Sequence, residues 1–480
     1  MHTPITRRRL LAGAAALAAA PMVSTSPVLA QAAPRRLLIE RRVIEVKGRA
    51  ATVFGLRQPE GVHGLTLDPG ERFLVDLENR SGEATIIHWH GQTPPYVQDG
   101  VADAARPVLA AGESRRYDFA PRPGTHWMHS HHGLQEQLLM AAPLIVRSAD
   151  DAKADVQEVV VLLHDFTFAD PAEVLAGLTG GGAMDHSMHG GHHGGHGAAQ
   201  GGGQADAATF KPMDLNDVEY DAYLANDRTL DDPAVFQVDR GGRVRLRLIN
   251  GATSTAFHID LGALQGAAVA VDGNPTAAVA GRVFAMTMGQ RLDILLEIPA
   301  TGGAFPIFAQ REGDRKRTGF VLATAGAAVP KLAGEADAAA PPVDLALERR
   351  LTALQPLSPK PADVGFTVRL TGGMSPYAWT IDDLPFGRHR PLTAPLGARV
   401  EIDMTNESDM AHPMHLHGFH FQVVGVNGAA LAGAMRDTVL VPVGGAIRIA
   451  FNADNPGRWP LHCHNLLHMA TGMMTEVVIA

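Results

Sequence analysis

The sequence predicts an all-β protein of three consecutive Greek-key β-sandwich domains. Three observations support this prediction. The length of 480 residues suits two to four domains, glycine and proline are abundant (51 and 32 residues), and one strand pattern occurs three times. Short strands separated by frequent turns are typical of β-sandwiches. We therefore expect one sandwich for each copy of the pattern.

Each copy of the pattern starts with glycine, any residue and arginine, continues with six residues of which every second is apolar, and ends at asparagine. The copies occupy residues 70–79, 241–250 and 397–406. The alternation predicts a half-buried strand, and the asparagine predicts a turn. We place the domains at residues 31–150, 151–340 and 341–480, with a boundary in the Ala/Pro-rich linker 335–342.

Residues 1–30 are typical of a signal peptide. Arg7, Arg8 and Arg9 precede an alanine- and leucine-rich run that ends in a small-residue cleavage pattern, Val28-Leu29-Ala30. The arginines favour twin-arginine export, and a plain secretory signal is the alternative. The apolar run is too short and too rich in alanine for a membrane span, and no other stretch approaches one. We expect a periplasmic protein that is soluble after cleavage.

The chain is acidic and has a single cysteine, Cys463. Its net charge is −9, and removal of residues 1–30 takes away three arginines and no acids, which leaves −12. A chain this acidic is a poor partner for nucleic acid. An unpaired cysteine is unusual in an exported protein, and ligation of a metal would explain it.

Histidines gather in four His-x-His pairs. On a strand, both histidines of a pair point to one face and the residue between them points to the other. A lone cysteine is usually a small buried apolar residue, and a His-x-His pair suits zinc as well as copper, but four pairs together favour a metal site. In the last pair the middle residue is Cys463. The pairs are His88/His90, His129/His131, His415/His417 and His462/His464.

Further candidate ligands lie near Cys463 and the third pair. His412 precedes the third pair by three residues, and His468 and Met473 follow the cysteine by five and ten residues. We expect the latter two on a loop that brings them back toward the thiolate. Two histidines, a cysteine and a weakly bound methionine form a blue-copper set.

The pairs belong to the first and third copies of the repeat. The corresponding places of the second copy hold Ile259 and Leu261, and Phe308 and Gln310. A metal cluster that uses all four pairs must therefore lie between the first and third domains. The second domain is expected to act as a spacer.

The histidine motifs resemble the four copper motifs of the multicopper oxidases, in the same order and along nearly the whole mature chain. They read HWHG (88–91), HSHH (129–132), HPMHLHG (412–418) and HCHNLLHMATGM (462–473). The resemblance implies cupredoxin domains and four copper ions. It implies that His412, Cys463, His468 and Met473 hold a type 1 copper. It also implies a type 2 copper on His88 and His415, and a type 3 pair on His90, His129, His464 and His131, His417, His462.

Acidic residues are candidates for proton delivery. The resemblance implies that Asp99, eleven residues after His88, relays protons to the oxygen-reducing site, although Gln98-Asp99-Gly100 is also an ordinary turn. Many relatives place a glutamate directly after the second type 1 histidine, where this chain has Met469. In this respect the chain is similar to the copper-resistance branch of the family. Asp409 and Met410, just before His412, add to the similarity, because cuprous-ion oxidases have an aspartate and a methionine there that receive the substrate metal.

The second domain contains an insertion at about residues 180–209, which we expect to be disordered. Residues 184–196 hold seven methionine or histidine side chains among glycines, a composition that suits copper ions or an incidental surface loop. The predicted function is oxidation of Cu(I), and of phenols and aromatic amines, coupled to reduction of dioxygen to water. The alternatives are a laccase, a manganese oxidase or a copper-sequestering protein. The sequence leaves the oligomeric state open.

Overall fold

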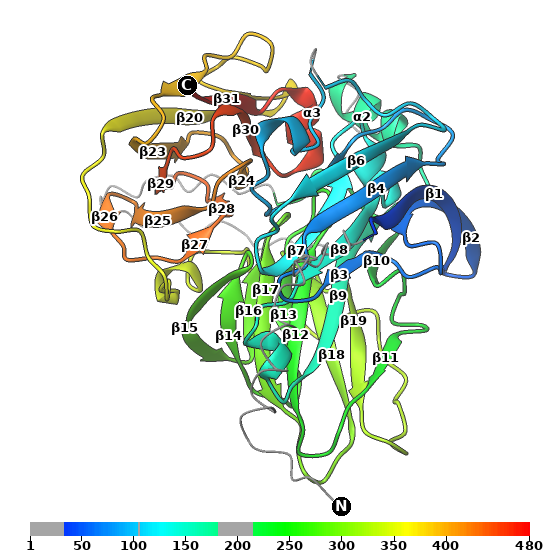
Figure 1. Ribbon diagram of the computed structural model, residues 1–480. Coiled ribbons are helices and arrows are strands. Elements are labelled where there is room, and N and C mark those ends of the chain that lie inside the picture. Colours follow the sequence, from blue (N-terminus) through cyan, green and yellow to red (C-terminus); the bar gives the residue numbers. More distant parts are fainter. Residues whose placement is uncertain (1–32, 104–105, 181–214) are drawn as a thin grey trace, which may run out of the picture. The chain divides into compact units, whose positions relative to one another are not determined.

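The computed structural model describes residues 33–103, 106–180 and 215–480, whose regular secondary structure consists mostly of β-strands (Figure 1). The predicted signal peptide and the stretch 184–196 lie outside the described residues. The strands form six sheets, two for each of three domains, so the predicted all-β class is confirmed. Within the described part of the chain, no helix is long and apolar enough to cross a membrane.

The first domain pairs a sheet of order β2-β1-β4-β6 with a sheet of order β3-β8-β7-β5. Its core contains Trp89 and Phe73, whose rings lie 4.7 Å apart. The elements are β1 (Arg35–Val46), β2 (Arg49–Arg57), β3 (Leu65–Leu67), β4 (Phe73–Asn79), β5 (Ile87–His88), η1 (Tyr96–Gln98), β6 (Ser114–Phe119), β7 (Gly124–Ser130), η2 (Gln135–Leu138) and β8 (Ala141–Val146).

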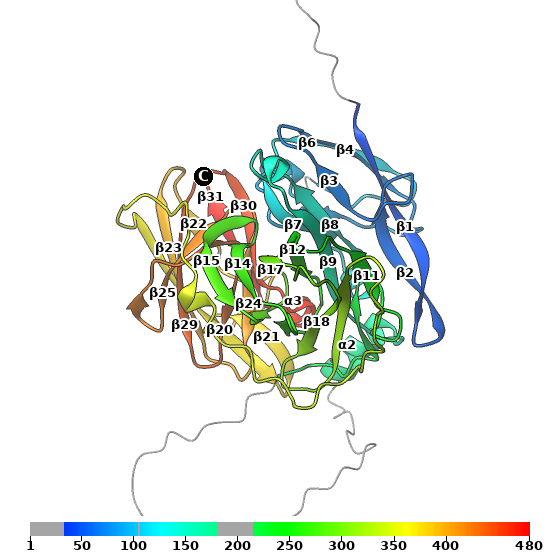
Figure 2. The same ribbon diagram turned by 90° about the horizontal axis from the view of Figure 1, so that it is seen from below.

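The second domain has sheets of order β10-β9-β12-β17-β14-β15 and β11-β19-β18-β13-β16. Figure 2 shows β9, β12, β17, β14 and β15 side by side in this order. Its helix α2 begins where the Asp170 side chain accepts a hydrogen bond from the Ala172 amide. The elements are η3 (Asp151–Lys153), β9 (Gln157–Phe166), α2 (Pro171–Thr179), β10 (Ala222–Ala225), β11 (Ala234–Gln237), β12 (Arg243–Asn250), β13 (Phe257–Asp260), β14 (Gly266–Val271), β15 (Asn274–Gly281), β16 (Val283–Met286), β17 (Arg291–Glu297), β18 (Ala304–Arg311) and β19 (Arg317–Ala323).

The third domain has sheets of order β21-β20-β23-β29-β25-β26, with β27 paired to β25, and β22-β31-β30-β24-β28. Its elements are η5 (Glu348–Arg350), β20 (Val364–Met374), β21 (Tyr377–Ile381), β22 (Leu392–Ala394), β23 (Arg399–Asn406), β24 (His412–Leu416), β25 (Phe421–Val426), β26 (Ala429–Ala430), β27 (Met435–Arg436), β28 (Thr438–Val441), β29 (Ala446–Asn452), β30 (Gly457–Cys463), α3 (Leu466–Thr471) and β31 (Met474–Ile479).

The three repeated segments form equivalent strands. Strands β4, β12 and β23 each pair in parallel with the first long strand of their domain, β1, β9 and β20 respectively. Each ends at a buried asparagine whose Oδ1 accepts the amide of the residue two positions later: Asn79 from Ser81, Asn250 from Ala252 and Asn406 from Ser408. This side-chain turn explains why asparagine recurs at the end of the pattern.

Residues 335–342, predicted as a linker, run beside the end of the β18–β19 hairpin. Glu335 forms a β-bridge with Lys316, and Ala340 forms one with Glu312. The stretch is therefore attached to the edge of the second domain by backbone hydrogen bonds.

Candidate metal centres

The cysteine meets two histidines in the third domain, which we call the Cys-His cluster (His412, Cys463 and His468). Cys463 Sγ lies 3.6 Å from Nδ1 of each histidine, and the two Nδ1 atoms lie 3.1 Å apart. All three side chains are buried. The strands explain the meeting, because β24 starts at His412 and pairs with β30, which ends at Cys463.

Helix α3 returns the chain to the thiolate, where the sequence predicted a loop. Asn465 caps the helix by accepting hydrogen bonds from the amides of Leu467 and His468. After the helix, Met473 is fully buried, and its carbonyl accepts the Cys463 amide at 3.1 Å. The segment Leu466–Thr471 is helical and not a loop because the Asn465 side chain accepts hydrogen bonds from two amides of the first turn, whereas Met473 lies beyond the helix.

Each histidine of the Cys-His cluster has an outer partner on its second nitrogen. His412 Nε2 lies 2.6 Å from Ser408 Oγ, and His468 Nε2 lies 3.2 Å from Asp217 Oδ1. Asp217 belongs to the second domain and also accepts hydrogen bonds from Tyr377 and Asn465. Burial opposes its ionisation, but the contacts with His468 and the hydrogen bonds leave the pKa of Asp217 lowered. No motif or spacing in the sequence singles out Asp217.

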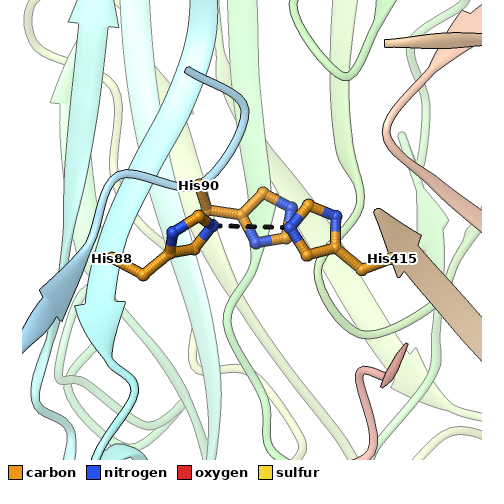
Figure 3. Close-up of side chains that lie close together, drawn as sticks. All are labelled: His88, His90 and His415. Carbon is orange, nitrogen blue, oxygen red and sulfur yellow. Dashed lines mark hydrogen bonds between the residues drawn. The ribbon is translucent and has the colours of Figure 1, made fainter. Parts of the chain in front are cut away.

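The eight histidines of the four pairs converge into one group, the eight-histidine cluster. Their ring nitrogens form three sets in which all atoms lie within 4.8 Å of one another. Figure 3 shows the first set, in which His88 Nε2 lies 3.4 Å from His415 Nε2. Every set mixes the first and third domains, as predicted. The sets are His88, His90, His415; His90, His129, His464; and His131, His417, His462.

Paired strands place these histidines. The first histidine of each pair is the last residue of its strand in β5 and the next to last in β7, β24 and β30, and the second histidine lies just beyond the end of the strand. His88 lies opposite His129 across β5 and β7, and His415 lies opposite His462 across β24 and β30. The residue between two paired histidines points away from the cluster. Cys463 therefore joins the Cys-His cluster while its neighbours His462 and His464 join two different histidine sets.

Most of these histidines hold their Nδ1 atoms against oxygen atoms. This arrangement directs Nε2 into the cluster, which is how a neutral imidazole presents its lone pair to a metal. The Nδ1 partners are the Asp99 carbonyl for His88, the Asp437 carbonyl for His415, the Asp99 carboxylate for His417 and the Cys463 carbonyl for His462, at 2.8 to 2.9 Å.

The electrostatics of both clusters suit metal cations. Burial, and then repulsion between neighbouring rings, lowers the pKa of the histidines well below 6.5, which keeps them neutral; this holds for His90, His129, His412, His415, His417 and His462. Burial raises the pKa of the Cys463 thiol, so a thiolate there requires a cation beside it. His129 Nε2 and His131 Nε2 are buried without a hydrogen-bond partner. The donor set fits copper.

Two carboxylates touch the eight-histidine cluster. Asp99 is fully buried; its Oδ2 lies 2.8 Å from His417 Nδ1, and its Oδ1 has no hydrogen-bond partner. Glu136, in η2, lies 2.9 Å from His129 Nδ1, and burial raises its pKa to about 7. Asp99 is among the residues predicted from the sequence, whereas Glu136 is not, and its only signal in the sequence is its position five residues after His131. Met469 is half-buried in α3.

The other residues that the sequence pointed to are buried or half-buried. Ile259 and Leu261 are buried in the second domain, which contributes no histidine to either cluster. Met410 is buried in the core of the third domain, and Asp409 is half-buried. The second domain is nevertheless more than the predicted spacer, because Asp217 reaches the Cys-His cluster and Arg291 reaches Asp437 beside the eight-histidine cluster.

Comparisons with known proteins agree with this arrangement. Three family models described as multicopper oxidase match residues 54–151, 157–329 and 360–480. Multicopper oxidase MmcO of Mycobacterium tuberculosis is 30% identical over 426 residues, which cover 85% of this chain and 79% of that protein. Copper resistance protein A homolog of Pseudomonas syringae pv. tomato is 27% identical, with 92% and 91% covered.

The fold is also shared with solved structures. The structure of Fet3p, a multicopper oxidase that functions in iron import, has a TM-score of 0.74 at 17% identity and covers 92% of this chain and 90% of that chain. The laccase of Botrytis aclada has a TM-score of 0.72 at 19% identity, with 92% and 87% covered. At these identities the likeness concerns the fold, which is that of three cupredoxin domains.

Proposed function

Because this chain belongs to the multicopper oxidase family, whose members couple oxidation of a substrate to reduction of dioxygen, we propose that it is a periplasmic oxidase of Cu(I) that serves copper tolerance. The observation that carries the proposal is the meeting of a Cys-His cluster with an eight-histidine cluster across the single segment His462-Cys463-His464. Relatives named copper resistance protein A support the substrate.

We assign four copper ions to these clusters. The Cys-His cluster with Met473 would hold the type 1 copper. The eight-histidine cluster would hold the type 2 copper and the type 3 pair, which together form a trinuclear centre. Bound copper ions would supply the one-electron steps and the reduction of dioxygen to water. The ligands are His412, Cys463, His468 and Met473 for type 1, His88 and His415 for type 2, and His90, His129, His464 with His131, His417, His462 for type 3.

The protein itself supplies orientation and protons. Asp99 orients two histidines of the trinuclear centre and has a free, fully buried carboxylate oxygen, which suits a proton relay. No glutamate stands at Met469, so Asp99 is the acidic relay that the sequence offers. Glu136 is a further carboxyl in contact with the centre.

The surroundings of the type 1 site favour a cationic substrate over an aromatic one. His412 and His468 are fully buried, so neither ring presents an open edge to a phenol. The outer nitrogen of His468 faces the carboxylate of Asp217, which is also buried and does not contact the substrate, but whose negative charge makes the potential around the site more favourable to a cation than to a neutral phenol. The stretch 184–196, outside the described residues, adds methionine and histidine side chains that bind Cu(I).

Removal of the thiolate tests the type 1 assignment. The copper-loaded protein should be blue through charge transfer from thiolate to copper, and Cys463→Ser should abolish both the colour and the oxidation of every substrate. Visible absorption and oxygen uptake check this outcome. A Cys463→Ser protein that is blue and active would overturn the assignment.

Side-by-side kinetics test the substrate. With copper-loaded protein, oxygen uptake should give the highest kcat/KM with Cu(I), compared with Mn(II) and a phenol. Asp217→Asn, which removes the charge and keeps the shape, should lower Cu(I) oxidation more than phenol oxidation. A preference for the phenol would identify a laccase, and laccases do occur among the relatives at 24–25% identity. Binding of far more than four copper ions with negligible turnover would identify a sequestering protein.

A further inference from the structure

The second domain inserts one arginine between the other two domains. Arg291, the first residue of β17, is 1% exposed. Its Nη1 donates to Asp437 Oδ1 at 2.7 Å, and its Nη2 contacts Asp437 Oδ2, so the guanidinium holds the carboxylate of the third domain with two nitrogens. Its Nε donates to the Thr125 carbonyl of the first domain at 3.2 Å. One side chain therefore bonds to both domains that carry the histidines.

Asp437 in turn contacts two of the proposed copper ligands. Its Oδ1 lies 3.1 Å from His90 Nε2, and its backbone carbonyl accepts a hydrogen bond from His415 Nδ1 at 2.8 Å. The other ring nitrogens of these histidines face the cluster: His90 Nδ1 lies 3.2 Å from His464, and His415 Nε2 lies 3.4 Å from His88. The position of Asp437 thus sets the orientation of one ring from the first domain and one from the third.

Further buried charges hold Arg291 and Asp437 in place. Asp272 Oδ1 accepts the Arg291 amide at 2.9 Å, and its Oδ2 accepts Arg436 Nη1 at 3.1 Å, one residue before Asp437. Glu348 accepts Arg436 Nε at 2.7 Å. All five side chains are at most 5% exposed. Removal of one member of a buried ion pair leaves the other as an unpaired buried charge, so these five side chains tolerate little displacement.

The backbone around the network leaves no spare room. A Cβ atom at Gly91, which follows His90, would lie 2.5 Å from Arg291 Nη2. A Cβ atom at Gly289, whose carbonyl accepts Arg291 Nη1, would lie 2.6 Å from His464 Cδ2. The turn that precedes β17 therefore packs directly against the histidine rings, and only glycine fits at these two positions.

We infer that Arg291 is a positioning residue of the trinuclear copper centre, through which the second domain, without a ligand of its own, sets the geometry of His90 and His415. The inference rests on the proposed copper assignment. A guanidinium suits this role because its planar donors hold both oxygens of a carboxylate at once, which a lysine cannot do.

The chain offers a matched control in Arg247. It lies in the same sheet, on β12, is 1% exposed, and pairs with Asp293 Oδ2 at 3.0 Å and with Glu158. Its Nη1 also reaches the first domain, at Thr125 Oγ1. Within the described part of the chain, none of its hydrogen bonds or ion pairs reaches a histidine of either cluster. Arg247 therefore shares the burial, the ion pairs and the interdomain contact of Arg291, and differs in having no link to copper ligands.

The experiment compares Arg291→Gln, Arg291→Lys and Arg247→Gln in full-length, copper-loaded protein. We expect both glutamine variants to lose thermal stability, while Arg247→Gln keeps four copper ions and the type 2 electron paramagnetic resonance signal. Arg291→Gln should keep the blue type 1 absorption but bind copper at the trinuclear centre roughly 10–100-fold more weakly, measured by competition with a chelator. Arg291→Lys should also alter the type 2 signal, because lysine keeps the charge but cannot hold both oxygens of the Asp437 carboxylate.

Each outcome decides the inference. If Arg291→Gln retains the copper content, the chelator resistance and the type 2 signal of Arg247→Gln, Arg291 is merely structural. If Arg291→Gln does not fold, an Arg291→Lys protein with an unchanged type 2 signal overturns the inference just as well. If the unaltered protein itself binds fewer than four copper ions or lacks the type 2 signal, the proposed function fails instead, and the two failures are thereby distinguished.

Discussion

Asp99 is the residue at which the orientation of the histidines and the proposed proton relay meet. Its carbonyl accepts His88 Nδ1 at 2.9 Å, and its carboxylate accepts His417 Nδ1 at 2.8 Å, so it holds one histidine from each of two domains. One carboxylate oxygen remains without a hydrogen-bond partner. A buried oxygen of this kind, within reach of the cluster, can receive and release a proton without disturbing either contact.

Replacement of Asp99 by asparagine tests the proton role. Asp99→Asn keeps the backbone carbonyl and the size of the side chain, so the four copper ions should remain bound. Turnover should fall roughly 10²-fold, within the usual range for acid–base groups. Reduction of the blue copper by substrate should stay fast in stopped-flow absorption. Slow reduction of the blue copper, with unchanged reoxidation by oxygen, would contradict the relay.

Buried histidines away from the clusters make the fold sensitive to acid. His164 is buried in the second domain, its Nδ1 lies 2.9 Å from the Gly251 carbonyl, and its Nε2 has no hydrogen-bond partner. Burial lowers the pKa of His164 from 6.5 to about 4. Between these pH values His164 is protonated in the unfolded chain but neutral in the folded chain, so the folded state loses stability as the pH falls from 6.5 to 4.

A glutamine at this position should remove that dependence. The lowered pKa of His164 corresponds to about 3 kcal/mol of stability lost by pH 4. Between pH 6.5 and 4, the free energy of unfolding should therefore fall less in His164→Gln than in the unaltered protein, by about 3 kcal/mol. This difference does not depend on the stability of the variant at pH 7.5. Urea denaturation of the copper-free protein at several pH values measures the difference. Parallel pH profiles for the two proteins would show that His164 titrates normally.

At the scale of elements, a tight turn packs against the short strand that carries His88. Strand β5 has two residues, Ile87 and His88, and η1 returns the chain so that Asp99 lies against it. Gly100, with φ of 86°, ends this return. A Cβ atom there would lie 1.8 Å from the Ile87 carbonyl oxygen and 2.9 Å from His88 Cα. The close approach of two backbones requires glycine.

Gly100→Ala should therefore displace β5 and weaken copper binding. Its control is Gly70→Ala, since Gly70 has nearly the same φ, 83°, with nothing within 4 Å of the added Cβ. Both variants carry the strain of a left-handed conformation, about 1 kcal/mol. We expect Gly100→Ala to be less stable than the control by about 1–3 kcal/mol and to lose type 2 copper. Equal urea midpoints and equal copper contents would show that β5 shifts without loss of stability or of copper binding.

At the scale of the whole molecule, two clusters are joined by one segment and surrounded by three domains. Cys463 lies in the Cys-His cluster and its two neighbours lie in the eight-histidine cluster, so the distance between the sites follows from a single peptide. The second domain reaches both clusters through outer partners, Asp217 and Arg291. On the proposed copper assignment, the site of electron entry and the site of oxygen reduction are therefore joined by one segment of the chain.

Deletion of residues 184–196 tests whether the His/Met-rich stretch serves the copper substrate. None of the proposed ligands lies in it, so the shortened protein should stay folded and blue with four copper ions. Phenol oxidation should be unchanged or faster, whereas Cu(I) oxidation at low, buffered Cu(I) should fall, because a tethered set of ligands raises the local copper concentration. Equal Cu(I) kinetics would make the stretch a passive insertion and would weaken the copper-tolerance proposal.

The sequence by itself determined the repeated strands and which of the proposed ligands share one face of a strand. Alternation along a strand is a local property, so His462 and His464 had to face away from Cys463, and the three asparagine turns marked equivalent strands. The motif order then separated the first and third domains from the second, which has Ile259 and Leu261 in place of histidines.

Only the tertiary structure decided which side chains surround those ligands. Asp217 meets His468 across 251 positions, and Arg291 meets Asp437 across 146. In the sequence these residues stand in ordinary surroundings, with no spacing or periodicity that sets them apart. Their roles arise because folding removes them from water, and a buried charge must find a partner wherever the packed domains provide one.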